Sequence, residues 1–174
     1  MILANETLLD STGASGAGAF LIDMNRAFEE FVAARLSSYL AGRLSVNAQR
    51  TQWLDLGNSV QIRPDLIFEP AAGDVSYVAD TKYKITADGF GRDTDYYQIL
   101  AYASSLNVPE GMLIYCQRDG FVPPREIEVG ARRTRLVTWA LRLSGTPADV
   151  EHRLRELAKQ IAIRANSKAT ADIP

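Results

Sequence analysis

The sequence predicts a single α/β domain in which a central mixed β-sheet of about five strands is flanked by helices. Apolar runs of strand length recur along the chain, and they are separated by segments whose apolar residues repeat at helical spacing. The chain has 174 residues, 47% of them hydrophobic and 23% charged, so it can bury a core like an ordinary globular protein. We expect a flexible segment over residues 1–19, one domain over 20–165 and a tail over 166–174.

Each expected helix opens with a capping residue and carries one apolar stripe, and each expected strand is bounded by turn residues. Asp23 is expected to cap the first helix. Pro64 predicts a bend just before Asp65, because proline has no backbone donor for a sheet. The expected elements, in order, are helix 24–41, strands 44–49, 60–68 and 77–84, helix 95–105, strand 111–116, strands near 127–129 and 136–143, and helix 147–165.

Two acidic residues lie on strands that we expect to form a hairpin. A short turn over 69–74, with glycine next to aspartate, joins the two apolar runs, so Asp65 and Asp80 should lie on neighbouring antiparallel strands. Side chains alternate between the faces of a strand, which places Asp80 and Lys82 on the same side. Lys84 shares that side, so the spacing does not choose between the two lysines.

Burying two carboxylates and a lysine near a hydrophobic core costs free energy unless a ligand binds beside them. Neighbouring carboxylates repel one another unless a cation lies between them, and Mg2+ (or Mn2+) accepts one or two carboxylates plus water while leaving positions for a phosphate oxygen. The pattern therefore predicts a site that cleaves phosphodiesters. Each aspartate also has a non-functional alternative. Asp65 could be a turn residue at the end of a strand, and Asp80 could pair with a lysine in a surface salt bridge.

These residues carry a resemblance to a known family. Pro64-Asp65 followed by Asp80-Thr81-Lys82 resembles the PD-(D/E)XK nuclease signature, and Gln98 to Tyr102 resembles the Q-x-x-x-Y helix of its RecB-like branch. More narrowly, residues 19–145 resemble the nuclease domain of McrC from the McrBC modified-cytosine restriction system. The segments that carry this narrower resemblance are Met24-Asn25-Arg26-Ala27-Phe28-Glu29, Arg63-Pro64-Asp65, Asp80-Thr81-Lys82-Tyr83-Lys84 and Asp95-Tyr96-Tyr97-Gln98.

The resemblance implies a PD-(D/E)XK restriction-endonuclease-like core and a role for each site residue. It implies that Asp65 and Asp80 hold the metal, that Lys82 is the working lysine and that Glu29 reaches the metal directly or through water. It also implies that Gln98 orients DNA or a water on the metal. By periodicity alone, a solvated position on its helix is the favoured interpretation of Glu29, and a pair such as Gln98 and Tyr102 is usually structural.

Lys84, Tyr102, Arg132 and Arg133 are the candidate contacts to DNA. The net charge of -2 and the pI near 5.5 are not those of a protein that binds nucleic acid tightly by itself. Arg132, Arg133 and Arg135 could form a local basic edge, although a solvated turn is the commoner meaning of such a run. We therefore expect weak DNA binding unless a partner assists.

The expected function is Mg2+-dependent endonucleolytic cleavage of DNA in a McrBC-like restriction system. In McrC proteins an upstream region docks on a GTP-driven translocase, McrB, and we expect the chain to be a stand-alone relative or an excised domain without that region. The run 11–18 lacks the lysine of a phosphate-binding loop, so a separate GTPase partner is expected. The alternatives are a repair or phage-type nuclease acting on ends or branched DNA, and a non-catalytic DNA-binding or assembly subunit.

Other features set the expected compartment and assembly. No apolar run reaches the length of a membrane span, and the start does not resemble a secretory signal. The single Cys116 excludes an internal disulfide, in keeping with a reducing compartment. We expect a cytoplasmic protein, and the final helix is a packing element or the interface of a homodimer.

Overall fold

The computed structural model describes residues 23–71, 73–83, 92–117 and 120–171. Residues 1–19, Lys84 and most of the segment between the expected strand 77–84 and the expected helix 95–105 lie outside the described residues. The elements are α1 (Met24–Leu40), β1 (Leu44–Ala48), β2 (Gln52–Trp53), β3 (Gln61–Ile62), β4 (Leu66–Pro70), β5 (Tyr77–Lys82), α2 (Asp93–Ser105), β6 (Glu110–Gln117), β7 (Arg125–Val129), β8 (Thr134–Arg142) and α3 (Pro147–Ala171).

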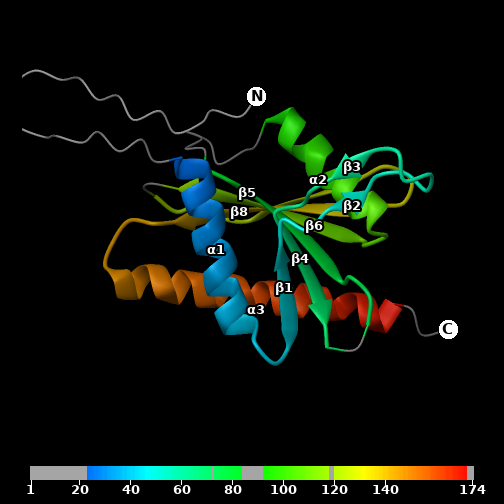
Figure 1. Cartoon of the computed structure of the whole chain (residues 1–174). Helices are drawn as coiled ribbons and strands as arrows, with labels where there is room; N and C mark the ends of the chain where they lie inside the picture. The colour runs from blue at the N-terminus through cyan, green and yellow to red at the C-terminus, as the bar shows by residue number, and fades with distance from the viewer. Residues whose placement is uncertain (1–22, 72, 84–91, 118–119, 172–174) are drawn as a thin grey trace, which may run out of the picture.

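A six-stranded mixed sheet in the order β1-β4-β5-β6-β8-β7 forms the centre of the fold, one strand more than the expected number. The strands β1, β4 and β5 pair antiparallel, β6 pairs parallel with β5 and with β8, and β7 closes the edge antiparallel to β8. Helices α1 and α3 cover one face, and α2 covers the other (Figure 1). The expected α/β architecture with a mixed central sheet is confirmed.

The two faces of the sheet carry separate cores, and β5 shows how the sequence divides between them. Tyr77 and Ala79 pack with α1 and α3, whereas Val78 packs with α2. This is the alternation expected of a strand buried on both sides. Asp80, two residues after Val78, therefore lies on the α2 side.

Helix α1 forms as its sequence predicts. The Asp23 side chain accepts hydrogen bonds from the backbone N–H groups of Asn25 and Arg26 at 3.0 and 3.3 Å, which satisfies donors that have no partner within the helix. Its buried residues are spaced three or four apart and face the sheet: Phe28, Val32, Leu36 and Leu40.

The strand expected over 60–68 is two strands in the structure. Its first part, β3, pairs with β2 in a separate two-stranded sheet, and its second part, β4, joins the main sheet. The division falls at Arg63-Pro64-Asp65, where the proline cannot donate to a ladder and the chain changes sheets. The bend that Pro64 predicts is therefore larger than expected.

Two helix boundaries also differ from the prediction. Helix α2 begins at Asp93 rather than at Asp95, and the Asp95 carboxylate accepts a hydrogen bond from the backbone N–H of Arg92 at 3.2 Å, which stabilises the first turn. Helix α3 continues to Ala171, beyond residue 165 and into the segment expected to be a tail. No helix among the described residues combines the length and the apolar character needed to cross a bilayer.

Helix α3 is tied to the sheet by a buried ionic cluster around Glu110. The Glu110 carboxylate accepts hydrogen bonds from Tyr77 Oη at 2.7 Å, from Arg164 Nη1 at 2.9 Å and from Arg135 Nη1 at 3.1 Å. Arg164 also donates to Glu126 on β7. One helix and three strands therefore meet at the Glu110 carboxylate, and Arg164 links β7 to them, which supports the packing alternative for α3.

Candidate functional site

Asp65, just before the start of β4, lies beside Asp80, near the end of β5. The register pairs Leu66 with Ala79, so the residue before β4 lies beside the fourth residue of β5. Asp65 Oδ2 accepts two hydrogen bonds from Thr81, one from the backbone N–H at 2.8 Å and one from the hydroxyl at 2.9 Å. The neighbouring position predicted for the two aspartates is confirmed.

Asp80 is a buried carboxylate whose oxygens are poorly satisfied. The residue is 0% exposed, and Oδ1 has no hydrogen-bond partner among the described residues. Lys82 Nζ lies 2.6 Å from Oδ2 as an ion pair. Burial, together with the negative charge of Asp65, raises the pKa of Asp80 to about 7, although Lys82 acts in the opposite direction.

Lys82 is held between the sheet and α2. Its ammonium donates to Gln98 Oε1 at 3.0 Å, and Gln98 Nε2 donates to Tyr102 Oη at 2.7 Å. Tyr102 Oη in turn donates to the Arg63 carbonyl at 3.4 Å. Burial lowers the pKa of Lys82, but the charge and hydrogen bond of Asp80, together with the charges of Asp65 and Asp95, outweigh it and leave the pKa raised, so the amine is a stable cation.

Glu29 approaches Asp65 through a residue that the sequence analysis did not single out. Gln49 Nε2 donates to Asp65 Oδ1 at 2.8 Å and also to Glu29 Oε1. Burial and the charge of Asp65 raise the pKa of Glu29, so it is not simply a solvated residue of α1. Gln49 directly follows β1 and has a φ of 53°, and no periodicity or motif in the sequence distinguishes it.

Two adjacent carboxylates among the described residues could bind a metal ion. One of them has a buried oxygen, Asp80 Oδ1, without a hydrogen-bond partner in the described ranges, and the pair matches the preference of Mg2+ for a few carboxylate ligands plus water. Glu29 is bonded to Gln49 on the outer side of Asp65, and within the described ranges no group of three acidic, histidine or cysteine side chains is arranged to hold a metal. Asp65 and Asp80 therefore fit the ion, with Glu29 beside them.

The remaining candidate residues divide between the site and the rest of the molecule. Tyr102 belongs to the site through Gln98. Arg132 and Arg133 do not, because their turn precedes Thr134, whereas Asp80 is aligned across β6 with Thr138 further along β8. Arg133 is also paired with Glu128 at 2.8 Å on the exposed edge.

Similarity to known proteins agrees with this geometry. No curated protein matches the chain. A chain in a solved structure described as a "Refined half-complex from tetradecameric assembly of Thermococcus gammatolerans McrB AAA+ hexamers with bound McrC" shares the fold, with a TM-score of 0.62 and 18% sequence identity. The similarity covers 83% of this chain but only 34% of that one. The family model described as "McrBC 5-methylcytosine restriction system component" matches residues 1–116, which is more than half of the 174 residues. The chain therefore belongs to the family of McrBC 5-methylcytosine restriction system components.

Proposed function

We propose that the chain is a Mg2+-dependent endonuclease that hydrolyses DNA phosphodiester bonds within a McrBC-like restriction system. The observation that carries the proposal is the fully buried Asp80 beside Asp65: its Oδ2 is paired with Lys82, and its Oδ1 has no hydrogen-bond partner among the described residues. Such a cluster is costly to bury in the absence of a cation. Membership of the McrBC family supports a restriction function.

Asp65 and Asp80 would hold the ion. When bound, Mg2+ supplies a Lewis acid that polarises the phosphate and lowers the pKa of water. Thr81 fixes one oxygen of Asp65 and Gln49 fixes the other, so this carboxylate is oriented before any ion arrives. Glu29 lies next in line and would accept a hydrogen bond from water on that side of the site.

Lys82 provides the positive charge for the reacting phosphate. In the structure the ammonium balances Asp80 at 2.6 Å, and a cation shared by the aspartates would release it to contact a phosphate oxygen. Its charge would then stabilise the additional negative charge of the pentavalent transition state. Gln98 and Tyr102 keep the amine aimed at this position, because they hold it from the α2 side.

A McrB-like GTPase is the proposed partner. The similar solved chain comes from a complex of McrB AAA+ hexamers with bound McrC. This chain spans about a third (34%) of the length of that chain, so the contact surfaces of the larger protein are not carried over. We extend only the pairing of a nuclease subunit with a separate motor, which also suits the net charge of -2 and weak DNA binding by the subunit alone.

Cleavage of supercoiled plasmid tests the proposal. The wild type, Asp80→Asn and the control Asp74→Asn, an exposed aspartate in the β4–β5 turn, are compared in Mg2+, Mn2+ and EDTA, with and without a McrB-like partner and GTP. We expect the wild type and Asp74→Asn to nick or linearise the plasmid only with metal, and Asp80→Asn to be inactive. An uncut plasmid in every wild-type reaction, or equal cutting by Asp80→Asn, would overturn the proposal.

A linear duplex and a DNA hairpin added to the same assay separate the alternative functions. A nuclease that acts on ends or branches would degrade these substrates and spare the covalently closed plasmid. A non-catalytic subunit would bind DNA equally well with and without the Asp80 carboxylate and would cut none of the substrates. The proposed endonuclease cuts the closed circle.

A further inference from the structure

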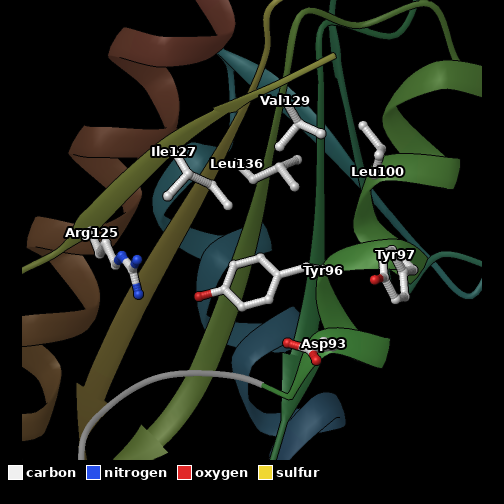
Figure 2. A pocket seen from close by; sticks show the side chains of 8 residues that line it. All are labelled: Asp93, Tyr96, Tyr97, Leu100, Arg125, Ile127, Val129 and Leu136. Carbon is white, nitrogen blue, oxygen red and sulfur yellow. The ribbon is translucent and has the colours of Figure 1, made fainter.

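A cavity of about 450 Å3 lies between α2 and the strands β7, at the edge of the sheet, and β8, its neighbour, and the proposed mechanism does not use it. Figure 2 shows side chains from both sides extending into this space. The cavity has an apolar floor and a rim of polar and aromatic side chains. Its lining residues are Asp93, Tyr96, Tyr97, Leu100, Arg125, Ile127, Val129 and Leu136.

The floor and rim of this cavity have different chemistry. The floor is aliphatic, because Ile127 and Val129 of β7 and Leu136 of β8 pack at the margin of the α2-side core. Tyr96 extends across the space, and its hydroxyl lies 3.2 Å from Thr138 Oγ1, which fixes the ring (Figure 2). An ordered aromatic ring over an aliphatic floor suits a flat apolar group.

The rim carries charges of both signs. Arg125, at the start of β7, supplies a guanidinium, and Asp93, at the start of α2, supplies a carboxylate (Figure 2). Tyr97 is 69% exposed, so its ring remains available to a ligand at the mouth. A donor and an acceptor at the edge of an apolar slot match a flat ring that has polar groups on its perimeter.

The cavity and the candidate site lie on different sides of α2, near its first turn. Gln98 accepts a hydrogen bond from Lys82 on one side, and Tyr96 contacts Thr138 of β8 on the other. Thr138 is aligned with Asp80 across β6, and the side chains of Asp80 and Lys82 lie on the α2 face of the sheet. A DNA strand with a phosphate at Lys82 that crosses the first turn of α2 would therefore reach the mouth of the cavity.

We propose that this cavity binds an unstacked nucleobase of the DNA strand whose phosphate lies at Asp80 and Lys82. The proposal rests on the proposed nuclease function. Stacking on aromatic rings and contact with arginine are the means by which proteins bind single-stranded bases. Asp93 would accept from an amino group of the base, and Arg125 would donate to a ring carbonyl or to the adjoining phosphate.

Oligonucleotide binding tests the inference without any cleavage. The probe is a short single-stranded DNA with one 2-aminopurine, whose fluorescence reports its stacking, and it is titrated in EDTA. The variants are Tyr97→Ala and Arg125→Ala. Tyr97→Phe keeps the ring, and Phe121→Ala removes a side chain that is 84% exposed and does not line the cavity.

We expect the Kd to rise about fivefold or more in Tyr97→Ala and Arg125→Ala, and to stay within about twofold of wild type in Tyr97→Phe and Phe121→Ala. Both alanine sites are exposed, so an unchanged Tm is expected and is measured in parallel. Equal binding by all variants, or no oligonucleotide binding by the wild type, would overturn the inference. So would weaker binding of a McrB-like partner with DNA binding unchanged, because it would assign the cavity to protein docking.

The two proposals fail in different ways in this assay. Asp80→Asn is expected to lose cutting, whereas Tyr97→Ala and Arg125→Ala are expected to weaken probe binding with the Asp80 carboxylate in place. If the wild type cuts no DNA and yet binds the probe through Tyr97 and Arg125, the nuclease proposal fails and the base subsite remains. If cutting is normal and the cavity variants bind like Phe121→Ala, the base subsite fails and the nuclease proposal stands.

Discussion

Gln49 and Asp65 are joined by two hydrogen bonds, one between their backbones at 3.0 Å and one from Gln49 Nε2 to Asp65 Oδ1 at 2.8 Å. The first fixes the main chain where β4 begins, and the second fixes the carboxylate. The same amide nitrogen reaches Glu29 on α1. A single glutamine therefore sets the positions of two of the acids in the candidate site.

Gln49→Ala should lower the cleavage rate by about 10- to 100-fold, as loss of a residue that orients a metal ligand usually does. Because Gln49 is a positioning residue, higher Mg2+ concentrations should recover part of the loss. Cleavage rates across a Mg2+ titration measure both effects. Gln61→Ala, an exposed glutamine on β3, is the matched control and should behave as wild type. An unchanged Mg2+ dependence in Gln49→Ala would argue against this role.

Mg2+ should stabilise the folded protein through the two aspartates. A ligand that binds only the folded state at about 100 times its Kd adds about 2.7 kcal/mol, which for a chain of this size raises the Tm by about 5–10 °C. Differential scanning fluorimetry with Mg2+ and EDTA measures the shift. Asp80→Asn should show almost none, and Asp74→Asn should shift like the wild type. Equal shifts in all three proteins would place the ion elsewhere.

The free energy of unfolding without metal should decrease as the pH rises from about 4 to 7. The Asp80 carboxyl has a folded pKa of about 7, against an ordinary value of 3.8. Between these values the unfolded chain has released this proton and the folded chain still binds it, so the contribution of Asp80 falls by up to about 1.4 kcal/mol per pH unit. Above the folded pKa of about 7, the contribution of the Asp80 carboxyl to the free energy of unfolding is lost.

Urea denaturation in EDTA at a series of pH values tests this dependence. The difference in unfolding free energy between the wild type and Asp80→Asn should decrease across the window and level off above about pH 7, because the asparagine does not titrate. Glu29 also has a raised pKa, but it is present in both proteins and largely cancels. A difference that stays constant from pH 4.5 to 7.5 would contradict the assignment.

Arg164→Met should destabilise the protein without direct contact with the candidate site. Its guanidinium bonds a Glu110 side chain that is 8% exposed, and loss of a hydrogen bond to a charged group costs about 1.5–3 kcal/mol. Urea unfolding measures the loss. Lys159→Ala, which removes an exposed pair with Glu156 on the same helix, should change stability by less than about 0.5 kcal/mol. Similar losses in the two variants would show that the Glu110 cluster is not a major contact.

The sequence predicted the part of the site that lies on one hairpin. Alternation along β5 placed Asp80 and Lys82 together, and the turn between β4 and β5 placed Asp65 beside them. These are short-range relations, since a strand repeats every two residues and a hairpin fixes its own register. The pairing of Gln98 with Tyr102 followed in the same way from the helical repeat.

The amino-acid sequence by itself determined the α/β class, most of the helices and strands, and the meeting of Asp65, Asp80 and Lys82. Only the tertiary structure decided that Gln49 bridges two acids and that Glu110 anchors α3. It also decided that β3 pairs outside the main sheet, with the change of sheet at Pro64, and that a cavity opens beside α2. The physical reason is distance along the chain. Each of these features depends on which element packs against which, and a local repeat carries no information about that choice.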